Sequence, residues 1–325
     1  MKFTSYRVSR RALLAAAICA VPFAAGAQTA SKEDLHFVTG FPPGSGADVI
    51  TRYFAEKTRA ISGRNVLVEN KVGASGSIAV EYVAKSKPDG NTLLINAGSG
   101  TAAGMHLQKN PPVDVVKAFQ IAGTINRQAF MMVVDAKGPY KNVADITAVL
   151  KAKGEKASYA TAAPSGIVMG EMYKAITGVK AVEVRYKDSA GSLNEILDGK
   201  LDYGMHDPVF SLAQQREGRL RILAHSSGKR LAAIPDVPTM DESGVKGMDL
   251  TSWWAYIAPS ATPKPVITQL NDYLKQILAM DETKKFLNQF GGDPFVSTPE
   301  EGQALLIKDE KDWREYVKLA KIEPQ

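Results

Sequence analysis

The sequence has little sulfur chemistry and few metal-binding side chains. Cys19 is the only cysteine in 325 residues, and it lies in a segment that we expect to be removed. A disulfide and a thiolate nucleophile are therefore excluded from the mature chain. The four histidines show no H-E-x-x-H or other metal-ligand spacing. We expect no metal and no cofactor.

Sequence motifs for catalysis and nucleotide binding are also missing. There is no G-x-x-x-x-G-K-[ST] loop and no G-x-S-x-G elbow; Gly73-Ala74-Ser75-Gly76-Ser77 fails at its last position. Residues 98–103 fit a permissive dinucleotide pattern, but they follow the third predicted strand. No strand-end acid lies about 20 residues further on, as a ribose contact requires. We expect neither catalysis nor nucleotide binding.

No apolar run reaches the roughly 20 residues that a membrane-spanning helix needs. The run at residues 12–21 follows a segment with four basic residues and no acid, and it precedes Ala25-Gly26-Ala27. This order is typical of a secretory leader cleaved after Ala27. We expect a soluble mature protein in the periplasm.

The export route stays open. Ser9-Arg10-Arg11-Ala12-Leu13-Leu14 resembles a twin-arginine signal, and the alternative is an ordinary basic segment that holds two adjacent arginines. A lipoprotein signal is not favoured, because a small residue should precede the cysteine and Ile18 is not small.

Positive charge is concentrated in the leader. The whole chain carries 40 Lys+Arg and 34 Asp+Glu, and removal of four basic residues lowers the net charge from +6 to 40 − 4 − 34 = +2. Nucleic-acid binding thereby loses its compositional support. The remaining 325 − 27 = 298 residues are enough for two domains.

Short β-branched runs alternate with amphipathic segments, which predicts an α/β protein with mainly parallel sheets. The predicted strands are 36–41, 65–69, 92–97, 130–134, 157–161, 181–186, 203–206, 220–224 and 254–258. The predicted helices are 47–61, 76–87, 143–153, 167–177, 193–198 and 264–280, with a last helix that opens at the capping box Thr298-Pro299-Glu300-Glu301.

Several predicted strands end in turns of Gly, Ser, Ala and Pro that lead into a helix. Small residues let backbone amides approach a ligand, and helix N-termini favour an anion. Taken alone, each turn is also explained as a tight connection between a strand and the capped start of the next helix. Repeated on two sheets, the turns predict two jaws that close on a carboxylate.

Two pairs of neighbouring side chains allow more than one interpretation. Asp207 ends a predicted strand and can contact a ligand hydroxyl, an amine or a bridging water, whereas His206 is equally explained by packing. Trp253 and Trp254 fit either the core or hinge, or the wall of a pocket.

Three segments resemble the Bug family, the extracytoplasmic receptors of tripartite tricarboxylate transporters. They are residues 41–48 (FPPGSGAD), 68–76 (VENKVGASG) and 84–94 (AKSKPDGNTLL), with further matches that include 234–239 (IPDVPT). The resemblance implies a type II periplasmic-binding-protein fold with two α/β domains around a central cleft. The domains would be residues 28–128 plus 252–325, and 129–251, after a signal peptide at 1–27.

The resemblance also implies a function and a site. The protein would capture a small organic carboxylate for the membrane components of a transporter, would bind no nucleic acid, and is expected to be a monomer. The first-jaw residues would be Pro43, Gly44, Ser45, Gly46, Ala47, Asp48, Ser99, Gly100 and Thr101. The second-jaw residues would be Ala163, Pro164, Ser165, Gly166, Asp188, Ser189, Ala190 and Asp207.

The chain departs from the family pattern at the predicted site. Ser45 replaces a glycine, and Ala47 replaces a hydroxyl residue that would make one hydrogen bond. Asp188 replaces a glycine and adds a negative charge near the second jaw. His206 and Met169 replace a more usual Phe and His. No named ligand is therefore carried over.

Two other functions remain open at this point. One is an exported enzyme that acts on a small carboxylate, which turnover of the ligand would reveal. The other is a receptor that signals to a membrane sensor, which neighbouring genes for membrane components would distinguish.

Overall fold

The computed structural model describes residues 33–324. The predicted leader and its cleavage site lie outside these residues. Among the described helices, none has the length and apolar character needed to cross a bilayer.

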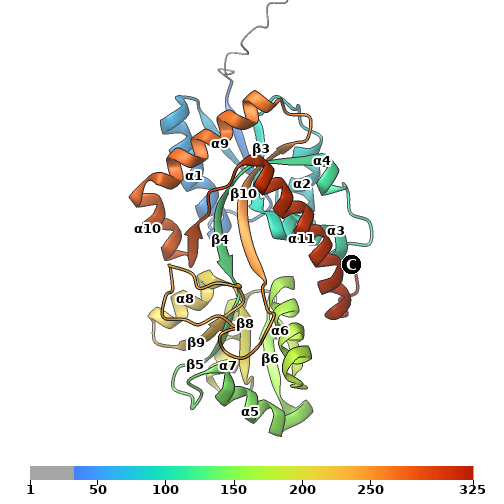
Figure 1. Ribbon diagram of the computed structural model, residues 1–325, viewed down its shortest axis with the longest axis vertical. Coiled ribbons are helices and arrows are strands. Elements are labelled where there is room, and N and C mark those ends of the chain that lie inside the picture. Colours follow the sequence, from blue (N-terminus) through green and yellow to red (C-terminus); the bar gives the residue numbers. More distant parts are fainter. Residues whose placement is uncertain (1–32, 325) are drawn as a thin grey trace, which may run out of the picture. The chain divides into compact units, whose positions relative to one another are not determined.

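The strands form two sheets. The first has the order β11-β4-β10-β3-β1-β2 and the second the order β7-β6-β8-β5-β9. Figure 1 shows the two groups of strands, with β4 and β10 in the first and β5, β6, β8 and β9 in the second. The first comprises β1 (Leu35–Thr39), β2 (Val66–Asn70), β3 (Thr92–Ala97), β4 (Phe119–Ala129), β10 (Thr251–Pro259) and β11 (Gly292–Pro294). The second comprises β5 (Met131–Asp135), β6 (Ser158–Thr161), β7 (Val182–Arg185), β8 (Tyr203–His206) and β9 (Leu220–His225).

Both sheets are mixed, so the expectation of mainly parallel sheets is wrong. β1 pairs in parallel with β2 and β3, but β10 runs antiparallel to both β3 and β4. In the second sheet β6 pairs in parallel with β7 and β8, while β5 is antiparallel to β8 and β9. β4 and β10 pair with each other at the places where the chain leaves the first sheet and returns to it, and this introduces the antiparallel pairs.

The helices cover these sheets. Those near the first sheet are α1 (Gly46–Ser62), α2 (Ser77–Ala84), α3 (Gly98–Leu107), α4 (Val115–Ala118), α9 (Lys264–Ala279), α10 (Asp281–Gln289) and α11 (Pro299–Leu319). The 3₁₀ turn η1 (Ala74–Gly76) precedes α2. The helices near the second sheet are α5 (Val143–Lys153), α6 (Pro164–Thr177), α7 (Leu193–Leu197) and α8 (Pro208–Arg216), with the 3₁₀ turns η2 (Gly154–Lys156) and η3 (Ser189–Ser192). The capping box that starts α11 is confirmed: Thr298 and Glu301 bond each other's backbone.

The first sheet buries a different core on each face. Trp254 and Tyr256 of β10 pack with Ile50 and Phe54 of α1 and with residues of α9; we call this the Trp254 face. Successive strand residues point to opposite faces, so Trp253 lies on the other side, which we call the Trp253 face.

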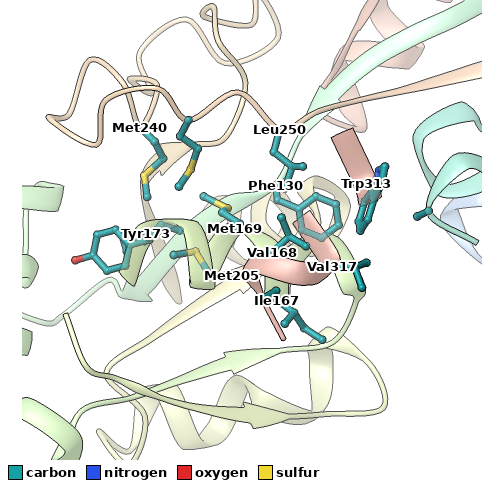
Figure 2. Close-up of a cluster of buried hydrophobic side chains, with 14 of the residues drawn as sticks. Phe130, Ile167, Val168, Met169, Tyr173, Met205, Met240, Leu250, Trp313 and Val317 are labelled. Atoms are coloured by element: carbon teal, nitrogen blue, oxygen red, sulfur yellow. The ribbon is translucent and has the colours of Figure 1, made fainter. Parts of the chain in front are cut away.

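The core of the Trp253 face continues into the second sheet. Trp313 and Val317 of α11 belong to the same buried cluster as Phe130, Ile167 and Val168 (Figure 2). The last helix therefore joins the two sheets through apolar packing on this face.

Candidate functional site

The turn between β1 and α1 contains six predicted site residues. Pro43 and Gly44 are exposed, and Gly44 has a φ of 81°, in the left-handed region that favours glycine. Ser45 is the N-cap of α1, and its hydroxyl accepts a hydrogen bond from the Asp48 amide at 3.3 Å. The turn is therefore held by its own side chains.

The Asp48 carboxylate is buried and fully engaged within this turn. Its Oδ2 accepts from the Gly44 amide at 2.9 Å and from Arg52 Nε at 2.9 Å, and its Oδ1 accepts from Asn70 Nδ2 at 2.7 Å. Burial opposes ionisation, but these hydrogen bonds outweigh it and lower the pKa of Asp48. Asp48 shapes the turn, and it uses the amide of Gly44 to do so.

Two amides at the start of α1 are left for a ligand. Gly46 and Ala47 occupy its first two positions, and neither amide has a hydrogen-bond acceptor among the described residues. The 17-residue helix places its positive end here. A Cβ on Gly46 would lie 3.5 Å from Val209 Cγ2 of α8, so this helix end lies against an element of the second sheet.

The structure brings Ser189 and Asp207 together. Asp207 is the N-cap of α8: it accepts from the Phe210 amide at 2.9 Å and from Ser189 Oγ at 2.7 Å. Asp188 caps η3 by accepting from the Gly191 amide at 2.9 Å, and Ala190 lies within that turn. The helix that Asp207 starts is the one that meets Gly46.

The predicted residues of α6 have a mainly structural setting. Ala163 is the N-cap and Pro164 the first helical residue. Gly166 is buried against β8, because a Cβ there would lie 2.5 Å from the Met205 carbonyl oxygen. Ser165, by contrast, lines a cavity.

The predicted residues of α3 divide in the same way. Ser99 is buried, shares a hydrogen bond with Ser252 (Oγ to Oγ 2.8 Å), and lines the same cavity as Ser165. Thr101 Oγ1 donates to the Ala97 carbonyl at 2.9 Å, within its own helix turn. Gly100 and Thr101 border a separate crevice beside α2.

A cavity of ≈ 190 Å³ lies between α3, α6 and α11 on the Trp253 face. Its wall has mixed charge: three aspartates stand against two cations. The charged lining residues are Arg127, Asp249, Lys308, Asp309 and Asp312. An anion is less favoured among these carboxylates than at the start of α1.

Asp309 is the most perturbed acid of that cavity. Burial raises its pKa to about 7, although the hydrogen bond from Trp253 Nε1 at 2.8 Å and the charge of Lys308 act in the opposite direction. Trp253 is 2% exposed, its ring would clash with any Cβ on Gly98, and it also lines the cavity. Core packing and pocket wall therefore both apply to this residue.

His206 is a packing residue. It is 1% exposed, its Nε2 shares a hydrogen bond with Ser192 Oγ at 2.9 Å, and its ring contacts Phe210. Burial lowers the pKa of His206 to about 4, so the ring is neutral at neutral pH. Across residues 33–324, no cluster of three or more His, Cys, Asp or Glu could hold a metal ion.

Sequence reasoning missed two buried polar side chains on the Trp254 face, Thr39 and Asn126, and it considered a third, Trp254, as core, hinge or pocket wall. Thr39, Asn126 and Trp254 are at most 5% exposed, and each has buried polar atoms without a partner among the described residues. The position of Asn126 could not be predicted, because the sequence analysis did not predict β4. The tryptophan pair was the only available signal.

Comparisons with known proteins all point in one direction. The family model described as "Tripartite tricarboxylate transporter family receptor" matches residues 50–321. A UPF0065 protein of Bordetella bronchiseptica is 29% identical over 321 residues, covering 98% of this chain and 95% of that protein. BugT of Bordetella pertussis is 27% identical over 295 residues, covering 90% of each.

Solved structures agree with this family. The periplasmic binding protein BugD is 30% identical, with a TM-score of 0.75 and coverage of 91% of this chain and 100% of that chain. Rpa4515 of R. palustris, solved with adipate, is 28% identical, with a TM-score of 0.79 and coverage of 90% and 99%.

Proposed function

The chain belongs to the tripartite tricarboxylate transporter receptor family, and on that premise we propose that it captures a small organic carboxylate at the N-terminus of α1. The family is one of periplasmic solute-binding receptors, so this chain is a binding protein and not an enzyme. The two mixed sheets form the periplasmic-binding-protein fold of BugD.

The observation that carries the proposal is the pair of free amides at Gly46 and Ala47. They lie at the positive end of a long helix whose first turn contains one acid, Asp48, and this carboxylate is paired with Arg52 and accepts a hydrogen bond from Asn70. Such an end binds an anion without a buried cation, which would be costly whenever the site is empty. The binding of adipate by Rpa4515 supports a carboxylate.

The proposal also covers the position of the cleft, the oligomeric state, the transporter partner and the export of the protein. We place its cleft between residues 28–128 plus 252–325 and residues 129–251, and we expect a monomer that delivers its ligand to the membrane components of the transporter. The leader ending at Ala27 would be removed in the periplasm, with the twin-arginine and general routes both open. Fractionation of the native host that found the intact Met1 form in the cytoplasm would contradict this.

A screen of carboxylates tests the ligand class. The mature protein should be heated with mono-, di- and tricarboxylates, adipate included. A ligand present at 100 times its dissociation constant stabilises the native state by about 2.7 kcal/mol, a readily measured rise in Tm.

Gly46→Val tests the position of the site. Valine at Gly46 adds an isopropyl group between the free amides and Val209, and we expect carboxylate affinity measured by calorimetry to fall at least about tenfold. Strain is not the reason, because the positive φ in this turn belongs to Gly44.

Gly46→Ala is the matched control. Its Cβ would sit at an ordinary contact distance of 3.5 Å from Val209, so binding should persist. If Gly46→Val folds normally and keeps its affinity for the carboxylate, the site lies elsewhere.

A further inference from the structure

Unpartnered polar atoms gather at one end of the Trp254 face. They are Thr39 Oγ1, Asn126 Nδ2 and Oδ1, and Trp254 Nε1, all without a hydrogen-bond partner among the described residues. Thr39 and Asn126 are 0% exposed and Trp254 is 5% exposed. A buried polar group that lacks a partner costs about 1–3 kcal/mol, so such a group in a native protein calls for an explanation.

Strand register places two of these side chains opposite each other and the third on the same face. Asn126 and Trp254 are directly opposite each other on β4 and β10, so both point to the same face. Thr39 ends β1 two residues after Phe37, whose ring contacts Tyr256 on that face. Asn126 and Trp254 therefore line the end of the first sheet that leads to α8 and the second sheet, and Thr39 lies on the same face at the end of β1.

The same region contains the proposed anion site. The ring of Phe41, at the start of the glycine turn, lies 5.8 Å from the ring of Trp254. α1 covers this face with Ile50 and Phe54, so the amides of Gly46 and Ala47 belong to the same end of it. On the far side, a Cβ on Gly291 would lie 2.9 Å from Pro208 Cβ of α8.

The chemistry of the three side chains selects what they can bind. The Trp254 indole only donates, the Asn126 amide donates and accepts, and the Thr39 hydroxyl does both. None carries a charge, so a second carboxylate would meet no cation among them and would leave Asn126 Oδ1 unsatisfied. A methyl group would leave all of them unsatisfied.

We propose that Trp254 and Asn126 are specificity-determining residues that bind a neutral hydrogen-bonding group, a hydroxyl or a primary amide, on the chain of the carboxylate ligand. This inference rests on the proposed function, since it takes the ligand carboxylate to lie at α1. Thr39 completes the polar end of the site.

A matched series of acids tests the inference on the wild-type protein. For the four-carbon chain the probes are butyrate, 4-hydroxybutyrate, succinamate and succinate, which differ only in the terminal group; the five- and six-carbon series are built likewise. At the chain length that binds best, the hydroxyl or amide acid should bind at least about tenfold more tightly than both the methyl-ended acid and the dicarboxylate.

Two variants that remove these polar atoms test whether Trp254 and Asn126 cause the preference for a hydroxyl or amide group. Trp254→Phe keeps an aromatic ring and removes the N–H, and Asn126→Leu keeps the volume and removes both polar atoms. Each should reduce the preference to less than about threefold while affinity for the methyl-ended acid changes by less than about threefold. Tyr203→Phe is the control: it also removes a buried unpartnered polar atom, but in the stack with Tyr159, and it should leave the preference unchanged.

The outcomes separate the two proposals. If acids bind and Gly46→Val weakens them, but the terminal-group ranking is the same in Trp254→Phe and Asn126→Leu, the inference is wrong and the proposed function stands. A dicarboxylate that binds most tightly to the wild type also overturns the inference. If no acid binds, both fail. Should Asn126→Leu not fold, Trp254→Phe decides alone.

Discussion

Two adjacent tryptophans have opposite surroundings in this protein. Trp253 donates its indole N–H to Asp309 and packs over Gly98. It belongs to the buried core through which α11 connects the first sheet to the second. Trp254 has no partner for its N–H among residues 33–324, and it lies beside Phe41, near the start of α1. The contrast separates the two faces of β10: one holds the sheets together, and the other carries the site that we propose for recognition.

The contacts between the sheets differ in the same way. On the Trp253 face large apolar side chains meet, with Trp313 and Val317 beside Phe130 and Ile167 (Figure 2). On the Trp254 face two glycines, Gly46 and Gly291, lie close to Val209 and Pro208 of α8. The missing side chain at Gly46 lets a ligand approach the two amides, whereas the cavity on the Trp253 face is lined by three aspartates and two cations.

Trp313→Ala should have the largest effect on stability. Trp313 is 2% exposed, and its truncation removes the main side chain that α11 inserts between the sheets. We expect the free energy of unfolding in urea to fall by about 3–5 kcal/mol. Carboxylate affinity of the folded variant should change less than about threefold.

Ile307→Ala on the same helix is the control, because Ile307 is 37% exposed and should cost less than about 0.5 kcal/mol. If Trp313→Ala abolishes ligand binding while the protein is still folded, the division of roles between the two faces is wrong.

Asp309→Asn should remove a pH dependence that belongs to the Trp253 face. The native pKa of Asp309, about 7, lies above its ordinary value of 3.8, so the native state holds this proton more tightly than the unfolded state. Its contribution to stability is complete below pH 4 and is lost as the pH rises through 7. The stability of the wild type relative to Asp309→Asn should therefore fall by about 2–3 kcal/mol between pH 5 and pH 8.

Asparagine can still accept the hydrogen bond from Trp253, so packing is preserved. Lys308, Asp312 and Asp249 also act on Asp309 and remain in the variant. Glu315→Gln removes an exposed carboxylate from the same helix, and its curve of stability against pH should run parallel to that of the wild type. Parallel curves for Asp309→Asn and the wild type would contradict the shift.

The fold was largely predictable because its local signals agree. The strands at 92–97 and 203–206 and the helix at 143–153 were predicted with the observed bounds. β4 was missed because it is a central strand buried on both faces, where hydrophobic alternation disappears. Its bulge opposite Trp254 and Ala255 disturbs the pattern further.

The site was less predictable, because its geometry depends on partners distant in sequence. The glycine turn was found, but the use of the Gly44 amide by Asp48 and the positive φ at Gly44 emerge only from the folded turn. Asn126 becomes a neighbour of Trp254 only through strand pairing. The domain boundaries and the ligand residues stay predictions.

Ala47→Thr should have the smallest effect on carboxylate affinity, and it tests a single hydrogen bond to the ligand at the start of α1. Ala47 is the second residue of α1, half-buried, with one of the two free amides, and it stands where the family usually has a hydroxyl. A threonine can add one hydrogen bond to the ligand, so affinity should stay the same or rise by up to about threefold. Ala47→Val has the same shape without the hydroxyl, and calorimetry on both variants separates the two effects. Equal weakening by both would mean that space at this position limits binding. A loss greater than about tenfold with Ala47→Thr alone would mean that the ligand carboxylate does not approach this amide.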